Sequence, residues 1–228
     1  MRNGTRVIRL LCLCALAGST GCVHLNRGEP SQRHFVLGGG TPEIGATTPS
    51  PEIAGVTLGV RRLELASYLS TPFMVVRRGP NQIGFSEFNR WGEPLEEGIN
   101  RVVARTLVSR GFQGAAVAPW PAGARYDYVI HLEVVRFEGV APEEPESVEG
   151  GVHLLATWEI LRQEDGAVLA RGTTDHEASG WTVGDYAGLV TLLDAGVDDL
   201  SDDLAASLEK LLAARRGGGD VHRVHPAA

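Results

Sequence analysis

Thiols are the most reactive side chains in this sequence of 228 residues, because a cysteine thiolate can act as a nucleophile or bind a metal. All three cysteines, Cys12, Cys14 and Cys22, lie within the first 22 residues. Three arginines precede them, and residues 10–18 form a short, mostly apolar run. This layout is typical of a secretory signal peptide, and the apolar run is too short for a transmembrane helix.

Small residues stand directly before Cys22, and they predict that its sulfur is modified. The stretch Ser19-Thr20-Gly21-Cys22 resembles the lipobox of bacterial lipoproteins, in which small residues fit the narrow pockets of a signal peptidase. The resemblance implies cleavage before Cys22 and acylation of its sulfur. Because Val23 follows in place of Asp, it also implies sorting to the outer membrane, facing the periplasm. The alternative is an ordinary signal peptide with an incidental cysteine.

Acylation would change both the anchoring and the chemistry of the chain. Acyl chains such as palmitate contribute about 0.8 kcal/mol per buried methylene, so the anchor would be effectively permanent. Cleavage before Cys22 would remove the other two cysteines and leave no free thiol for a disulfide, a metal or a nucleophile. It would also leave 18 basic and 28 acidic residues, a formal charge of −10. This balance argues against nucleic-acid binding and against electrostatic docking on anionic lipid.

The remaining candidate chemistry is a set of histidines and carboxylates. His131 and Glu133 share one face of an expected strand, and His153 lies on the next strand, so the three could bind a cation if the strands pair. We interpret them, and the cluster at residues 175–177, as solvated polar residues of a sheet. The sequence contains no GxSxG, HExxH, Walker or CxxC motif. We therefore expect no catalytic residue, no metal and no cofactor; the alternative, a periplasmic hydrolase, would be supported by bound zinc.

Alternation of apolar and polar residues predicts a sheet that must position any site. The expected strands cover residues 33–39, 56–65 with a bulge near Arg61-Arg62, 73–79, 82–88, 126–139, 151–163 and 167–178. Turn residues at 79–81 and 164–166 predict two hairpins. The acidic, proline-containing residues 141–151 predict an exposed loop between the two long strands.

Two helices are predicted by apolar residues at a spacing of three and four. The first covers residues 93–110, and Pro94 suits its first turn. The second covers residues 185–214 and carries a continuous apolar stripe, which we expect to cover the sheet; the alternative is a groove for a partner. Strands that precede and interrupt two helices favour an α+β fold, with an antiparallel or mixed sheet and both helices on one face.

The domain organisation follows from these assignments. We expect a lipoprotein signal peptide at residues 1–21 and a lipidated tether at residues 22–32. A single α+β domain follows at residues 33–215, and residues 216–228 form a disordered tail without apolar periodicity. The long stripe of the last helix also permits, without requiring, a homo-oligomer.

Residues 65–107 resemble the PqiC-like family of ABC-type transport auxiliary lipoproteins, subunits of membrane-integrity transporters. That family shows a Tyr-Leu-x-x-Pro element, a short strand ending in Arg, and Arg-Trp-x-Glu-Pro-Leu at the start of a helix. The matching positions here are Tyr68, Leu69, Pro72, Arg77 or Arg78, Glu87, Phe88, Arg90, Trp91, Glu93, Pro94 and Leu95. Phe137-Glu138-Gly139 also looks like the family.

The resemblance implies a non-enzymatic outer-membrane lipoprotein that works with a periplasmic MCE-domain protein and an inner-membrane transporter component to move lipids or hydrophobic molecules. The expected docking surface comprises Tyr68, Pro72, Arg78, Trp91 and Pro94, because aromatic and Arg side chains dominate interface energies. Alternatively, Trp91 is buried and holds the start of the helix. A second function class is an accessory lipoprotein that regulates cell-envelope or cell-wall assembly.

Overall fold

Nine strands and two α-helices make up the parts of the chain described by the computed structural model, residues 31–39, 53–144 and 147–219. In chain order, the elements are β1 (Arg33–Phe35), β2 (Thr57–Val60), β3 (Glu64–Leu65), the 3₁₀ turn η1 (Ser67–Leu69), β4 (Phe73–Arg78), β5 (Gln82–Trp91), α2 (Leu95–Ser109), β6 (Gly114–Val117), β7 (Tyr128–Ala141), β8 (Glu149–Arg162), β9 (Val168–Thr182) and α3 (Tyr186–Gly219).

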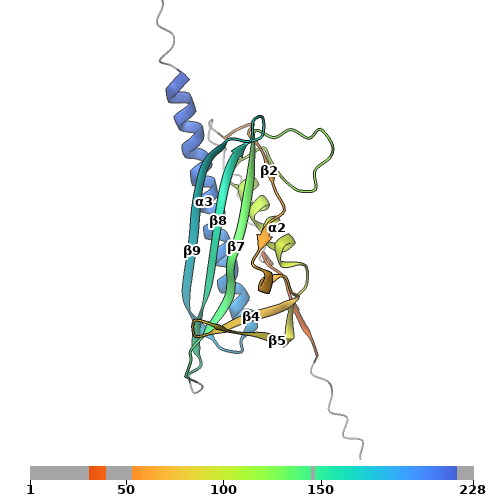
Figure 1. Cartoon of the computed structure of the whole chain (residues 1–228), viewed down its shortest axis with the longest axis vertical. Coiled ribbons are helices and arrows are strands. Elements are labelled where there is room, and N and C mark those ends of the chain that lie inside the picture. Colours follow the sequence, from red (N-terminus) through yellow and green to blue (C-terminus); the bar gives the residue numbers. More distant parts are fainter. Residues whose placement is uncertain (1–30, 40–52, 145–146, 220–228) are drawn as a thin grey trace, which may run out of the picture. The chain divides into compact units, whose positions relative to one another are not determined.

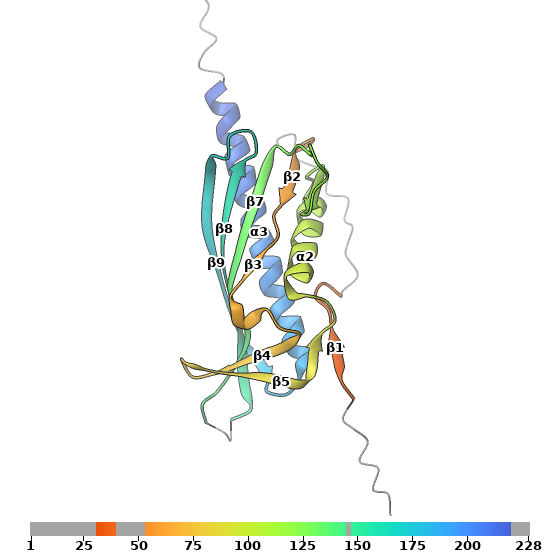
Figure 2. The same cartoon turned by 45° about the vertical axis from the view of Figure 1, so that its right-hand side comes forward.

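Strand β7 is the centre of a mixed sheet. On one edge it pairs in antiparallel fashion with β8, which pairs in turn with β9. Along its other edge the short strands β2, β3 and β4 pair in parallel one after another, as Figure 2 shows. β6 pairs with β2, β5 with β4, and β1 with β5. The prediction of an α+β fold with a mixed sheet is confirmed.

Both helices lie on one face of the sheet. Helix α3 packs on β8 and β9 and contacts α2 (Figure 1). Its apolar stripe is buried at Leu189, Leu193, Val197, Leu200, Leu204 and Leu208. The interpretation that this stripe covers the sheet is therefore confirmed. Because the chain's own sheet buries these side chains, the stripe is not a free surface for a partner or a second copy.

The predicted strands are present, but several ends differ. β1 ends at Phe35 rather than residue 39, β9 continues to Thr182 rather than ending at residue 178, and the loop expected at residues 141–151 is shorter, because β7 runs to Ala141 and β8 begins at Glu149. The predicted facing of the long strands is confirmed. The inward residues of β8, Val152, Leu154, Ala156, Trp158 and Ile160, are all buried. The irregularity expected near Arg61-Arg62 is a break in pairing, since β2 ends at Val60 and β3 begins at Glu64. The sequence did not predict β6, a short strand of small residues.

The helix boundaries differ slightly from those expected. Helix α2 begins at Leu95 rather than residue 93, because Pro94 occupies its N-cap. Helix α3 continues to Gly219, so four residues expected in the tail are helical, and residues 220–228 lie outside the described residues. Within the described ranges, neither helix is both long and apolar enough to cross a membrane.

The segment after β1 is fastened to both helices. The Gly38 N–H donates to Asp194 Oδ1 of α3 at 2.8 Å. From α2, the Arg105 guanidinium donates to the Gly38 carbonyl at 3.2 Å, and Arg101 Nη2 donates to the Leu37 carbonyl at 3.0 Å. Gly38 has φ = 61°, a conformation that favours glycine, and an added Cβ would meet Val102 at 2.8 Å. We call this set of bonds the Gly38 clamp.

Candidate docking site

A groove of about 410 Å³ lies where the end of β5 meets the start of α2. It brings together three of the five residues expected in the docking surface, Pro72, Trp91 and Pro94. Both prolines are exposed. The complete lining comprises Ser70, Thr71, Pro72, Trp91, Gly92, Glu93, Pro94, Leu95 and Glu96. We call this depression the proline groove.

Backbone hydrogen bonds hold the two walls of the proline groove together. The Trp91 N–H donates to the Pro72 carbonyl at 2.8 Å, which joins β5 to the segment before β4. The N–H groups of Glu97 and Gly98 donate to the Pro94 carbonyl at 3.0 and 3.1 Å. Pro94, at φ = −52° and ψ = 130°, thus caps α2 with its carbonyl and needs no N–H of its own.

Trp91 contributes a wall of the groove rather than an exposed anchor. Its exposed fraction is 7%, and its ring lies 5.8 Å from that of Phe137, centroid to centroid. The structure therefore agrees with the alternative in which Trp91 is buried and holds the start of α2. The neighbouring Glu93 forms an ion pair with Arg101 of α2, which fixes the same junction from the solvent side.

Tyr68 does not line the proline groove; its hydroxyl belongs to a buried charged cluster. Glu138 of β7 is fully buried, and its carboxylate forms an ion pair with the Arg77 guanidinium. The Tyr68 hydroxyl lies 2.8 Å from Glu138 Oε2 and 3.0 Å from the Val135 carbonyl, and donates its proton to one of the two. Burial first, then the hydrogen bond and charge of Glu138, raise the pKa of Tyr68 to about 12.

The sequence alone did not predict that three side chains form this cluster, which comprises Tyr68, Arg77 and Glu138. Alternation along β7 is interrupted between Val134 and Arg136, where the pairing with β8 shifts by one residue. The shift changes which side chains share a face, so a pattern read across it misplaces Glu138. The only signal was the resemblance of Phe137-Glu138-Gly139 and of Arg77 or Arg78 to the family pattern. The structure separates the two arginines, since Arg77 pairs with Glu138 while Arg78 does not.

Arg78, the fifth expected docking residue, is exposed and lies away from the groove. Its Nη1 donates to the Pro142 carbonyl at 2.9 Å, which ties the β4–β5 hairpin to the connection between β7 and β8. The expected docking surface is therefore three separate features: the proline groove, the inward-facing Tyr68, and Arg78 on the hairpin. Cys22, the expected lipid attachment site, lies outside the described residues.

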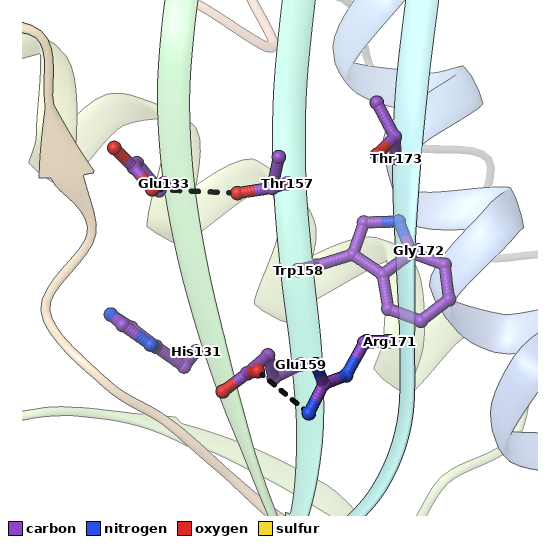
Figure 3. A pocket seen from close by; sticks show the side chains of 8 residues that line it. All are labelled: His131, Glu133, Thr157, Trp158, Glu159, Arg171, Gly172 and Thr173. Carbon is purple, nitrogen blue, oxygen red and sulfur yellow. Dashed lines mark hydrogen bonds and ion pairs between the residues drawn. The ribbon is translucent and has the colours of Figure 1, made fainter.

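The residues considered for a metal do not converge. His131 Nε2 lies 3.2 Å from Glu64 Oε1 of β3, whereas His153 Nε2 lies 2.8 Å from Asp175 Oδ1 of β9. His131 and Glu133 line a hollow of about 340 Å³ over β7, β8 and β9 (Figure 3). His153 does not line it, and the Arg171 guanidinium reaches into the same hollow toward Glu159, at 3.7 Å.

A second histidine cluster contains His153, Asp175 and Glu177. The two carboxylates approach different ring nitrogens, Asp175 at Nε2 and Glu177 at Nδ1, 3.6 Å away. Arg136 Nη1 also lies 3.2 Å from His153 Nδ1, and a guanidinium can only donate there. With the Arg136 guanidinium and Glu177 near one nitrogen and Asp175 at the other, the geometry is that of a hydrogen-bonded network, and we assign no metal to it.

Comparisons with known proteins agree with the fold and the motifs. A family model described as "ABC-type transport auxiliary lipoprotein component" matches residues 40–205. A search of curated proteins found no match. The structure is similar to that of protein XCC0632 from Xanthomonas campestris, a DUF330 protein, with 18% identity, a TM-score of 0.60, and coverage of 75% of this chain and 94% of that one. It is also similar to an uncharacterized protein with 18% identity, a TM-score of 0.58, and coverage of 78% and 99%.

Proposed function

Because the chain belongs to the ABC-type transport auxiliary lipoprotein family, we propose that it is a non-catalytic, lipid-anchored subunit of an intermembrane transport system. In this proposal, Cys22 carries acyl chains in the periplasmic leaflet of the outer membrane. The folded domain docks a periplasmic MCE-domain protein, which works with an inner-membrane transporter component to move lipids or other hydrophobic molecules. The chain's task is then attachment and recognition.

The observation that carries the docking proposal is the proline groove. Its exposed rims are Pro72 and Pro94, which have no side-chain conformational entropy to lose on binding. Backbone bonds and the buried Trp91 fix the distance between the rims before any partner arrives. Preformed grooves of this kind bind with a smaller ordering cost than mobile loops.

The charges at the groove favour a partner segment with an apolar side chain next to a basic residue. Glu96 lines the groove, and Glu93 lines it while paired with Arg101. In this proposal, the apolar side chain fills the groove against Trp91, and the basic residue lies near Glu96. Complementary charge of this kind contributes to orientation and association rate.

The experiment makes the same Glu→Lys substitution at two adjacent residues, one inside the groove and one beside it. Glu96 lines the groove and Glu97 is exposed beside it, and both lie in the first turn of α2. Glu96→Lys and Glu97→Lys therefore change the net charge and the helix terminus alike. We expect co-purification of the MCE-domain partner from membranes to fall about tenfold for Glu96→Lys and less than twofold for Glu97→Lys.

Equal recovery of the partner by the two folded variants would refute the groove as the docking site. Thr71→Arg, which places a long side chain in the groove from the opposite rim, serves as a second groove variant with the same expected loss. The anchor is tested separately by mass spectrometry of the mature chain. An unmodified sulfur at Cys22, or a freely shed protein, would refute the lipoprotein assignment.

A further inference from the structure

Two phenylalanines of β5 remain exposed although most large apolar side chains of the described residues are buried. Phe85 is 48% exposed and Phe88 is 42% exposed. The other large hydrophobic residues with comparable exposure in the described ranges are valines: Val36, Val108, Val148 and Val168. The pairing of β5 with β4 is irregular between Phe85 and Arg90, so the usual alternation does not decide which face Phe88 takes. Half-exposed aromatic rings at such a stretch point to a surface that contacts something apolar.

Phe85 belongs to a larger surface at one end of the sheet. It lines a hollow of about 260 Å³ with the apolar residues Val76, Trp181, Val183 and Tyr186, where the β4–β5 hairpin meets the link between β9 and α3; the polar residues Arg78, Gln82 and Ser86 line it too. Val148, whose side chain is 62% exposed, adjoins this surface, because its carbonyl accepts a hydrogen bond from the Val183 N–H. We call Phe85, Phe88, Val148 and Val183 the apolar end.

The polypeptide enters the domain beside this surface. Strand β1 pairs with the last residues of β5, and Arg33 is opposite Asn89, the residue that follows Phe88. Figure 1 shows β1 starting at the same end of the sheet as the β4–β5 hairpin. Ten residues, 23–32, separate Cys22 from Arg33, and a fully extended chain of that length spans at most about 35 Å.

We propose that the apolar end rests on the bilayer, with Phe85 and Phe88 inserted into the interfacial layer of lipid. The inference rests on the proposed acylation of Cys22, because the tether would then keep the start of β1, and with it the end of β5, within about 35 Å of the membrane. Aromatic rings are favoured at the boundary between headgroups and acyl chains. The contact would fix how the domain faces the periplasm, which a tether alone does not do.

The charges around the apolar end select the kind of lipid. Arg33, Arg78 and Arg90 lie on β1, β4 and β5, and acidic residues occur on the same and neighbouring segments: Glu87 on β5, Glu143 and Glu144 after β7, and Glu149 at the start of β8. These described residues comprise three basic and four acidic side chains, so together they provide no net attraction to anionic headgroups. The contact is therefore apolar, matches a zwitterionic surface such as phosphatidylethanolamine, and is not strengthened by anionic lipid.

The test uses the mature acylated lipoprotein, which begins at Cys22, so that an introduced cysteine is the single free thiol. Phe85→Cys, Phe88→Cys and Val148→Cys place an environment-sensitive fluorophore at the apolar end. Val168→Cys and Val108→Cys are matched controls, because these residues are 40% and 47% exposed and lie at the start of β9 and on α2. The proteins are reconstituted in phosphatidylethanolamine–phosphatidylcholine vesicles containing lipids that carry a nitroxide quencher.

We expect quenching at positions 85, 88 and 148 to exceed quenching at 108 and 168 by about threefold or more, with little change when phosphatidylglycerol is added. Position 148 gives this readout without replacing an aromatic ring, and circular dichroism checks the fold of each variant. Equal quenching at all positions of an acylated chain would overturn this inference alone and would make the aromatic pair a surface for protein contact. Labelling of Cys22 in the unsubstituted chain would overturn the anchor and, with it, the inference.

Discussion

Removal of the buried charge at Glu138 should destabilise the protein more than any conservative surface change. Glu138→Gln keeps the shape of the side chain but leaves the Arg77 guanidinium without its counter-charge. Arg77 is only 14% exposed, and its remaining bond is to the Pro80 carbonyl at 2.9 Å. Breaking a buried ion pair from one side costs about 3–5 kcal/mol. Because Arg77 keeps some solvent contact and one carbonyl, we expect about 3 kcal/mol, the lower end of that range.

The measurement is urea unfolding followed by circular dichroism, with an unchanged denaturant slope showing that stability alone has altered. Glu133→Gln is the matched control, because Glu133 lies on the same strand but is exposed. We expect that variant to change the free energy of unfolding by less than about 0.5 kcal/mol. Arg77→Met and the double variant complete a thermodynamic cycle.

The cycle distinguishes an ion pair from two independent packing effects. If Arg77 and Glu138 stabilise each other, the double variant should be more stable than the sum of the single losses predicts, by about 1.5 kcal/mol or more. A Glu138→Gln loss no larger than that of Glu133→Gln, or strictly additive effects of the two substitutions, would refute the reasoning.

Three further predictions concern stability. Burial and the neighbouring carboxylate hold the pKa of Tyr68 at about 12 in the folded state, above its unfolded value of about 10. The stabilisation from this raised pKa is therefore complete below pH 10 and is lost as the pH rises to 12. In urea unfolding, the wild type should lose stability relative to Tyr68→Phe between about pH 10 and pH 12. Gly172→Ala should cost about 1–3 kcal/mol in urea unfolding, because the added methyl overlaps the Trp158 ring, whereas Gly114→Ala, with open space around it, should be near neutral. Leu200→Ala, in the fully buried stripe of α3, should cost about 3 kcal/mol and lower the melting temperature.

Local patterns were sufficient for the elements that bury one continuous face. The stripe of α3 and the alternation in β8 predict the packing of helix on sheet, because each repeat reports a single buried side. The hairpin between β4 and β5 was likewise predicted from its turn residues. These features depend on neighbours in sequence, so a single sequence contains the necessary information.

The pairings along the second edge of β7 could not be predicted in this way. β2 pairs in parallel with both β6 and β7, more than 50 residues further along the chain. Such pairing needs long connections that leave no local signal, and β6 is too short and too small in side-chain volume to be recognised. The sequence therefore predicts that these strands form a sheet, but not the order of the strands within it.

The candidate site was only partly predicted, because some of its contacts also join residues that are distant in sequence. Pro72, Trp91 and Pro94 are separated in sequence but belong to motifs that family resemblance already joined. The inward position of Tyr68 depends on the buried Glu138, which the register shift in β7 conceals. A carboxylate on a strand is expected to contact solvent unless it has buried partners. The partners of Glu138 are Arg77 on β4 and Tyr68 in the turn before it, which are distant in sequence.

The Gly38 clamp determines how mechanical tension would enter the domain. In the proposed arrangement, with Cys22 anchored and the domain docked on a partner, any movement of the partner away from the membrane would pull on the chain at β1. Three residues of β1 offer little resistance if peeled from β5. The next bonds along the chain connect Leu37 and Gly38 to α2 and α3, so force passes into the helical layer and its buried stripe before it can unzip the sheet.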